Sequence, residues 1–220
     1  MSKKLITFSL WGSNPKYTVG AIRNAVLATI LYPDWLCRYY VGKSVPNEIV
    51  QTLKNFNNVE IIEMEEEGNW SGMFWRFYPA SEQDVDVMIS RDCDSRLSLR
   101  EKLAVDEWLK SDKGFHIMRD HPWHGTHILG GMWGVKKGVL PQMKNEIDNF
   151  VKGEFWQVDQ NFLSRVIYPL VKENTMVHDE FFNFDNHKIK FPSERINKEF
   201  VGDVFDHNDN RHPNYWKIIN

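Results

Sequence analysis

The first 60 residues alternate between strand-like and helix-like segments, and this alternation constrains the fold more than any other feature of the sequence. Residues 5–10, 35–41 and 59–64 are short and rich in strand formers, whereas residues 17–31 and 46–56 carry apolar side chains at helical spacing. Helices that connect successive strands of one sheet form right-handed crossovers, which makes the strands parallel. The segment therefore predicts a largely parallel sheet.

The rest of the chain continues this pattern with shorter elements. Ser98 and Glu101 fit a capping box at the start of a helix. From residue 172 onward the pattern becomes short, polar and irregular. We expect strands at residues 85–90, 115–118 and 128–135, and helices at residues 71–78, 98–110, 140–151 and 157–166. The sequence thus predicts a single α/β domain over residues 1–220, with a mostly parallel mixed sheet flanked by helices and a loop-rich C-terminal tail.

Composition narrows the class of protein further. The 220 residues are 42% hydrophobic, which is enough for a core, and the formal net charge of −3 does not favour nucleic acid as a partner. Two cysteines, Cys37 and Cys93, lie in apolar stretches and are expected to be buried, reduced thiols. The N-terminus lacks the apolar core of a signal peptide, and no segment has the roughly 20 apolar residues of a membrane span. We therefore expect a soluble, cytoplasmic protein with no transmembrane segment.

Two carboxylates, Asp92 and Asp94, follow the apolar strand predicted at residues 85–90. In an extended chain these side chains point the same way, and Cys93 points back into the packing. Ligands of open parallel sheets bind just beyond the carboxyl ends of the strands. Two adjacent like charges are costly unless a cation lies near them, and hard oxygen ligands suit Mg²⁺ or Mn²⁺. The alternative is a pair of exposed carboxylates that cap the next helix.

Six motifs together resemble those of GT-A-type glycosyltransferases, and in particular the small single-domain forms of bacteria and of large algal DNA viruses. The motifs are Ser9-Leu10-Trp11-Gly12, Gly72-Met73-Phe74-Trp75-Arg76, Ser90-Arg91-Asp92-Cys93-Asp94-Ser95-Arg96, His121-Pro122-Trp123-His124-Gly125-Thr126, Gly130-Gly131-Met132-Trp133-Gly134 and Asp159-Gln160. The resemblance covers about residues 4–170. It implies a Rossmann-like GT-A domain with a nucleotide-binding half at 4–94, a sugar and acceptor half at 95–170, and an irregular tail at 171–220.

The resemblance also implies a donor site for a nucleotide sugar. The turn after the first strand would hold the base and ribose, Asp92 would lie toward the ribose or the metal, and Asp94 would bind the metal. Arg76 is a bidentate donor suited to a phosphate or a sugar hydroxyl. The alternatives are a packing role for Trp11 and a surface ion pair of Arg76 with residues 65–67. The donor-binding candidates are Ser9, Leu10, Trp11, Tyr17, Arg76, Asp92, Gly130 and Gly131.

Gly130 and Gly131 interrupt the strand predicted at residues 128–135. Glycine in a strand suggests either close approach of a ligand to the backbone or a bulge needed only for sheet curvature. In GT-A enzymes this region lies under the donor sugar. Asp159 is the candidate catalytic residue, either as the base that activates the acceptor or as a positioning carboxylate. Its place near the start of a predicted helix also suits a carboxylate that only stabilises the helix.

The segment from His121 to His127 contains three imidazoles and raises the possibility of zinc. Because Pro122 and Gly125 favour a loop, no helical spacing aligns these rings. We prefer a loop that contacts donor or acceptor sugar, with Trp123 as a stacking platform and His124 beside it. In the later chain, Asp203, His207 and His178 are candidates for a further metal ligand, and their spacing does not select among them.

The function that these features favour is transfer of a hexose or deoxyhexose from a nucleoside diphosphate, preferably UDP, to a saccharide or glycoconjugate acceptor, with Mn²⁺ or Mg²⁺ as the cofactor. Two alternatives stay open. A metal-dependent phosphoesterase would use Asp92, Asp94 and the histidine-rich loop, but it would need two metals and ligands from several strands. A catalytically silent sugar-binding module would retain the aromatic and glycine-rich surfaces without needing Asp94 or Asp159.

Overall fold

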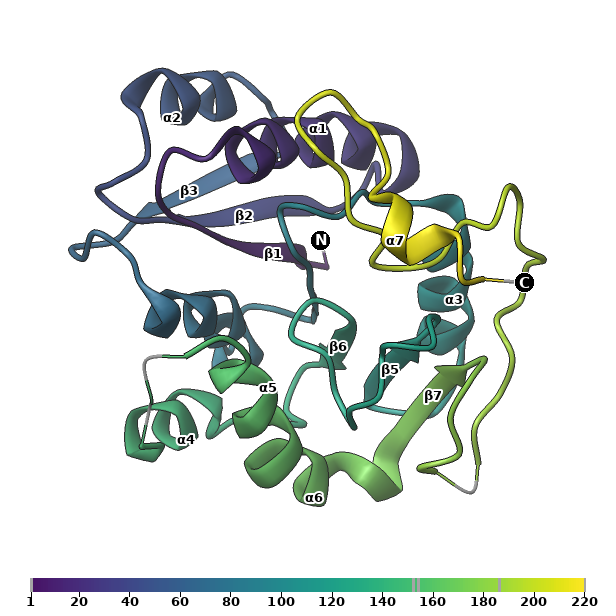
Figure 1. Ribbon diagram of the computed structural model, residues 1–220. Coiled ribbons are helices and arrows are strands. Elements are labelled where there is room, and N and C mark those ends of the chain that lie inside the picture. Colours follow the sequence, from purple (N-terminus) through teal and green to yellow (C-terminus); the bar gives the residue numbers. More distant parts are fainter. Residues whose placement is uncertain (1, 152, 154, 186, 220) are drawn as a thin grey trace.

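In the computed structural model, which describes residues 2–151, 153, 155–185 and 187–219, seven strands form one sheet between helical layers (Figure 1). Their order across the sheet is β3-β2-β1-β4-β6-β5-β7. β6 runs antiparallel to both of its neighbours, and the other adjacent pairs are parallel. The predicted mostly parallel mixed sheet is confirmed. The strands are β1 (Lys4–Leu10), β2 (Leu36–Val41), β3 (Val59–Glu63), β4 (Val87–Ser90), β5 (Phe115–Arg119), β6 (Trp133–Lys136) and β7 (Thr175–Asp179).

Helices cover both faces of this sheet. Figure 1 shows α1 and α2 over β1, β2 and β3, and it shows α4, α5 and α6 on the opposite side. The first layer consists of α1 (Pro15–Leu31), α2 (Asn47–Lys54) and α3 (Leu99–Lys110). The second consists of the 3₁₀ helix η1 (Trp70–Ser81), α4 (Met143–Asn149), α5 (Val158–Phe162), the π-helical turn η2 (Leu163–Ile167), α6 (Tyr168–Val171) and the 3₁₀ turn η3 (Lys172–Asn174). A short helix, α7 (Pro213–Trp216), lies near the C-terminus.

Side-chain alternation along β1 divides the core into two halves. Leu5 packs with η1 and α4, whereas Ile6, Phe8 and Leu10 pack under α1 and α2. Successive side chains of a strand point to opposite faces, so Ser9 lies on the same face as Leu5, toward η1. This alternation decides which residues of the first motif can face a ligand.

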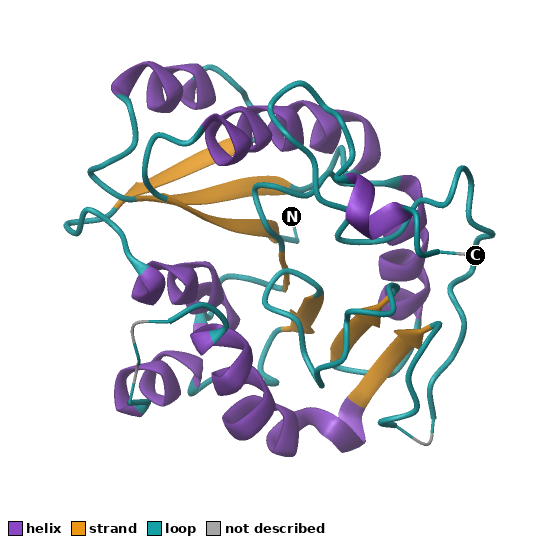
Figure 2. Ribbon diagram, viewed as in Figure 1, coloured by secondary structure: helices purple, strands orange, loops and turns teal. Residues whose placement is uncertain are grey.

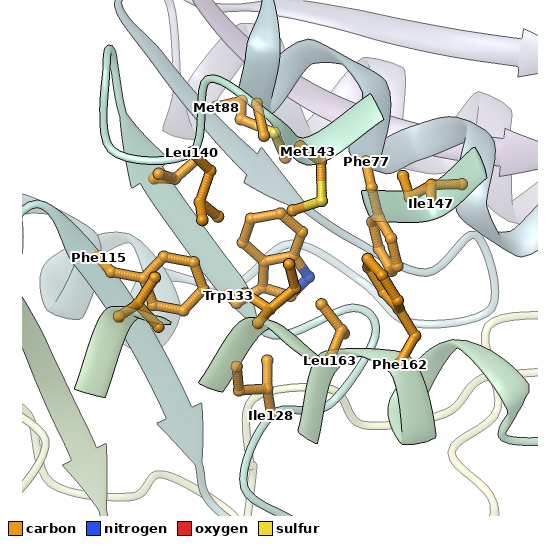
Figure 3. Packing of buried hydrophobic residues seen from close by; sticks show 14 of the residues in the cluster. Phe77, Met88, Phe115, Ile128, Trp133, Leu140, Met143, Ile147, Phe162 and Leu163 are labelled. Atoms are coloured by element: carbon orange, nitrogen blue, oxygen red, sulfur yellow. The ribbon is translucent and has the colours of Figure 1, made fainter. Parts of the chain in front are cut away.

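Trp133 forms the centre of the half of the core that includes η1 and α5 (Figure 3). Its ring stacks on Phe115 with a centroid separation of 5.3 Å and meets the edge of Phe77 at 5.2 Å. Residues from β4, α4 and η2 surround the same ring in Figure 3. This packing holds η1 and α5 against the sheet, and both elements carry residues of the candidate site.

Three predicted segments differ from the structure. The strand expected at residues 128–135 begins only at Trp133, and residues 130–132 form a turn before it. The chain beyond residue 171 is not wholly irregular, because β7 pairs in parallel with β5. The helix expected at 157–166 also continues through η2, α6 and η3. After β7, Figure 2 shows a chain that is mostly loop.

Both cysteines are buried and free, as expected. Within the described ranges, no helix is both long and apolar enough to cross a membrane.

Candidate active site

The candidate site lies where β1 and β4 end. These two strands are parallel neighbours, and β2 and β3 extend the sheet on the far side of β1. The order in which successive strands are added to the sheet therefore reverses between β1 and β4, which is where open α/β sheets bind ligands. The backbone amide of Arg91 donates to Thr7 O at 3.0 Å and continues the pairing past the end of β4. The next residues, Asp92 and Asp94, lie directly at this edge.

Asp92, Cys93 and Asp94 form a turn and not the extended segment that the sequence suggested. The Asp92 carbonyl accepts a hydrogen bond from the Ser95 hydroxyl at 3.0 Å, which closes this turn. Cys93 is buried beneath it, as expected, and the two carboxylates remain close enough for Asp92 to raise the pKa of Asp94. Asp92 is 45% exposed and Asp94 is 18% exposed. A bound cation would meet one open and one more enclosed carboxylate.

Arg76, on η1, joins Asp92 to Asp159, which lies on α5. Its Nη1 donates to Asp92 Oδ1 and, at 3.0 Å, to the carbonyl of Arg91, while its Nη2 donates to Asp159 Oδ2 at 2.9 Å. The Arg76 amide donates to the Ser9 hydroxyl at 3.1 Å. The guanidinium is buried and both terminal nitrogens are engaged. In this conformation the ion pairs of Arg76 are with Asp92 and Asp159 and not with residues 65–67. A contact of Arg76 with a phosphate or a sugar hydroxyl stays a prediction.

Gly130 and Gly131 make this ion-pair bridge possible. A Cβ atom on Gly130 would overlap the side chains of Asp159 and Arg76, and one on Gly131 would overlap Asp92. The Gly130 carbonyl also accepts a hydrogen bond from Ser90 Oγ at 2.7 Å. The groups that closely approach these glycines are side chains of the site, and the glycines precede a strand. The predicted approach of a ligand to their backbone stays a prediction.

Burial raises the pKa of two carboxylates of the site, Asp94 and Asp159. It raises the pKa of Asp159, against the opposing effect of Arg76, and nearby Asp92 adds to the increase. Burial is also the largest cause of the raised pKa of Asp94, followed by Asp92, and Lys16 opposes both. Binding of a group that neutralises Asp94 more strongly than one lysine does would therefore be favourable here.

Of the residues in the motif that follows β1, some lie at the site and others are buried in the core. Ser9 holds the backbone of Arg76, as described, but the Leu10 side chain is buried under α1. Its carbonyl accepts a sheet hydrogen bond from Gly42 at 2.9 Å. The expected contact of Leu10 with the donor stays a prediction. Trp11 packs edge-on against Trp75 with centroids 6.2 Å apart and remains partly exposed. A base could stack only on the exposed part of this ring.

Tyr17 lies on the other side of the carboxylate turn. The Lys16 ammonium is 5.2 Å from the Tyr17 ring centroid and 2.6 Å from Asp94 Oδ2. Burial and then Asp94 raise the pKa of Tyr17, which places its hydroxyl near that carboxylate. Tyr17 is 38% exposed and therefore keeps a face for a ligand.

Trp123 and His124 belong to a loop that packs on the C-terminal tail. The Trp123 ring is 58% exposed and meets Tyr215 edge-on at 5.2 Å. His124 accepts a hydrogen bond from the Asp120 amide at 3.1 Å, and burial lowers its pKa to about 3. His124 is thus an anchor of the loop, whereas Trp123 retains an open face for a sugar.

The other proposed ligands do not converge with Asp92 and Asp94. His178 contacts His116 at 2.8 Å and Glu107 at 3.2 Å, and Asp203 pairs with Arg211. His207 is exposed. In the part of the chain that the structure describes, no three His, Cys, Asp or Glu side chains gather as a metal-binding group. Two oxygen donors fit Mn²⁺ or Mg²⁺ only where substrate phosphates and water complete the coordination, which is the usual arrangement for Mg²⁺.

The carboxylates do not line the hollows elsewhere on the surface. Two such hollows have volumes of about 480 and 300 Å³. Asp92, Asp94 and Asp159 line neither of them. Lys16 and Arg76 form ion pairs with these carboxylates, so a cation that binds them would compete with these side chains.

Solved structures similar to this chain share its fold. One is a glycosyltransferase involved in glycosylation of the major capsid of PBCV-1, with a TM-score of 0.55 and 15% identity over 81% of this chain and 82% of that chain. Another is a mannosyltransferase from Pyrobaculum calidifontis in complex with GDP-Man and Mn²⁺, with a TM-score of 0.54 and 11% identity over 81% of this chain and 55% of that chain.

A 4-diphosphocytidyl-2C-methyl-D-erythritol synthase from Anaerococcus prevotii also shares the fold, with a TM-score of 0.52 and 10% identity over 88% of this chain and 94% of that chain. No protein-family model and no curated protein matches the sequence. The chain therefore has a GT-A-type fold, and the expected resemblance to a viral glycosyltransferase is confirmed at the level of fold. The same architecture also serves a different nucleotide enzyme, so function has to be argued from the site.

Lys16, which pairs with Asp94, is not among the site residues predicted from the sequence. Two signals were available in the sequence. Lys16 immediately follows Pro15 and precedes the helix predicted at residues 17–31, and that helix start lies beside the carboxyl end of β1. Only the tertiary structure shows that this end also faces Asp94.

Proposed function

We propose that this protein is a metal-dependent glycosyltransferase that transfers a hexose or deoxyhexose from a nucleoside diphosphate, preferably UDP, to a saccharide or glycoconjugate acceptor. The observation that carries the proposal is the Asp92–Arg76–Asp159 bridge at the switch point of a GT-A-type sheet. It links the candidate metal-binding turn to the helix that carries the candidate catalytic residue. The mannosyltransferase of this fold that binds GDP-Man and Mn²⁺ supports the cofactor and makes GDP the second base to test.

In this proposal residues 4–94 bind the nucleotide and residues 95–170 the sugar and acceptor. Trp11 and Tyr17 present exposed ring area for the base and ribose, and Trp123 offers a ring face to a sugar. Asp92 and Asp94 would hold Mn²⁺ or Mg²⁺, which supplies positive charge for the leaving diphosphate. Gly130 and Gly131 keep space beside Asp92 and Asp159.

The reaction forms a bond between an acceptor oxygen and the anomeric carbon and breaks the bond between that carbon and the diphosphate oxygen. The nucleoside diphosphate leaves with the bonding electron pair, and the proton of the acceptor hydroxyl passes to this leaving group or to water. Asp159 is 3% exposed and already accepts hydrogen bonds from Arg76 and, at 2.8 Å, from the Gln160 amide. This burial favours the positioning role over the base role for Asp159, and it applies to a retaining or an inverting reaction.

The test is calorimetric titration of UDP and of GDP, with and without MnCl₂, into the protein and into Asp94→Asn. We expect metal-dependent binding of one nucleotide, reduced at least about tenfold in the variant, because the neutral amide is a weaker ligand. Donor-sugar hydrolysis and transfer to saccharides would then be screened with the nucleotide that binds.

Other outcomes distinguish the remaining functions. Absence of nucleotide binding under every metal condition contradicts the proposal and directs attention to phosphoesterase substrates. Metal-dependent binding of a nucleotide sugar with no hydrolysis or transfer would indicate a silent binding module. Lys144→Gln, which removes an exposed ion pair on α4, serves as the control and should bind like the unmodified protein.

A further inference from the structure

The Lys16 side chain is the positively charged group that contacts Asp94. Its ammonium is 2.6 Å from Asp94 Oδ2, and the two side chains are 34% and 18% exposed respectively. Arg76 contacts Asp92 in the same turn. The positively charged side chains of Lys16 and Arg76 therefore contact the two carboxylates that would bind a metal ion. Of the two, Lys16 is the more exposed, since the Arg76 side chain is 6% exposed and held at both ends.

The surroundings of Lys16 hold its backbone but leave its side chain able to move. The backbone amide is fixed by the N-cap of α1, where Asn14 Oδ1 accepts it at 3.0 Å. The ammonium lies over the ring of Tyr17 and close to Tyr215 of the tail. A lysine carries its charge on a flexible four-carbon stem with three donors, so it can exchange one anionic partner for another nearby.

We propose that Lys16 is a built-in counter-ion of Asp94 that yields this carboxylate to a divalent cation and then binds the diphosphate of the donor. This inference rests on the proposed function and adds a residue to its donor site. In the donor-free protein the ammonium neutralises Asp94. With a divalent cation on Asp94, Coulomb repulsion drives the ammonium away, and the nearby anionic phosphates are its next partner.

Two measurable effects of opposite sign follow from this exchange. A cation that competes for Asp94 weakens binding of the metal alone, so removing Lys16 strengthens it. A cation that contacts the diphosphate strengthens nucleotide binding, so removing Lys16 weakens it. A residue with a merely structural role would not produce this pair of effects.

The experiment compares the Lys16→Gln variant with the unmodified protein in two titrations. We expect Mn²⁺ alone, followed by the electron paramagnetic resonance of the free ion, to bind the variant about three- to tenfold more tightly. We expect UDP or GDP, titrated in saturating Mn²⁺, to bind it about three- to tenfold more weakly. Lys16→Arg retains the charge and should keep both affinities closer to those of the unmodified protein.

Lys54→Gln is the matched control, because it removes the same charge from a lysine–carboxylate pair on α2, away from the site. It should change neither affinity. The inference is overturned if Lys16→Gln leaves Mn²⁺ affinity unchanged or lower, or if its nucleotide affinity does not fall. The proposed function is contradicted by a different result, namely that the unmodified protein binds no nucleotide in the presence of Mn²⁺. In that case the titration with Mn²⁺ alone still measures whether Lys16 competes with the metal ion for Asp94.

Discussion

The ion pair between Arg76 and Asp159 is linked to a second carboxylate, Asp92, through the Arg76 side chain. Asp159 is buried, and its carboxylate is stabilised by the guanidinium of Arg76 at 2.9 Å. Arg76 in turn holds Asp92, the exposed carboxylate of the turn after β4. A substitution of Asp159 is therefore expected to affect Asp92, a candidate metal ligand, because Arg76 contacts both carboxylates.

For Asp159→Asn we expect the KM of the donor to rise by about tenfold or more, with a smaller change in kcat. The neutral amide loses a charge-assisted hydrogen bond to Arg76, worth about 1.5–3 kcal/mol, and Arg76 then holds Asp92 less well. Steady-state kinetics with the donor identified by titration measures both parameters.

Asp148→Asn, an exposed carboxylate on α4 paired with Lys144, is the matched control and should leave both parameters unchanged. A fall in kcat of about 10²–10⁴ with unchanged KM would contradict the positioning role and identify Asp159 as a general base.

The adjacent strands β5 and β7 place two histidines in contact inside the protein. His116 Nε2 and His178 Nδ1 are 2.8 Å apart, and the His178 ring also contacts Glu107 of α3 at 3.2 Å. Burial lowers the pKa of His116 well below its ordinary value of 6.5, and His178 and Arg91 lower it further. Burial also lowers the pKa of His178, although Glu107 opposes this effect.

These shifts predict a loss of stability in mild acid. The unfolded chain takes up protons near the ordinary histidine pKa, whereas the folded chain resists them, so the free energy of unfolding falls as pH decreases below about 6.5. Chemical denaturation at pH values between about 7.5 and 5.5 measures this slope. His116→Gln removes one of the two groups and should make the slope shallower, and an identical slope in the variant would exclude the histidine pair as its source.

At the scale of the whole molecule, Asp120 joins the sheet to the C-terminal tail. Arg100 of α3 donates to both oxygens of this carboxylate, at 2.8 and 2.9 Å, and Arg195 of the tail contacts it as well. The amide of Val201 adds a hydrogen bond at 2.9 Å. A few residues later the tail pairs with the carboxylate turn, where the Phe205 amide donates to the Asp94 carbonyl at 2.9 Å.

We expect Asp120→Ala to lower the free energy of unfolding by about 3–5 kcal/mol, because it removes the carboxylate that pairs with both Arg100 and Arg195 and leaves buried Arg100 with Glu180 as its remaining carboxylate. The tail should also become easier to cleave in limited proteolysis, which mass spectrometry can locate beyond about residue 190. Asp148→Ala removes only an exposed ion pair and should change stability by about 0.5 kcal/mol or less. Equal effects of the two variants would show that Asp120 does not anchor the tail.

Local patterns in the sequence are sufficient to predict much of the architecture. Periodicity identified β1, β2, β3, β4 and β5, and it identified the helices between them, because each of these elements buries its own apolar face. The strand β7 was missed because it reads Thr-Met-Val-His-Asp, with a histidine and an aspartate at its end. Those polar groups are buried only because His116 and Arg119 of β5 pair with them.

The candidate site, like the fold, could be predicted from the sequence only where it depends on local patterns. The sequence by itself determined that two carboxylates follow a buried strand at the ligand-binding edge of the sheet, since a short apolar run and its flanking turn are local properties. Only the tertiary structure decided that Arg76 bridges Asp92 and Asp159, that Lys16 neutralises Asp94, and that Leu10 faces the core. These contacts join residues as many as 83 positions apart, and their strength depends on burial and distance that only the packed chain sets.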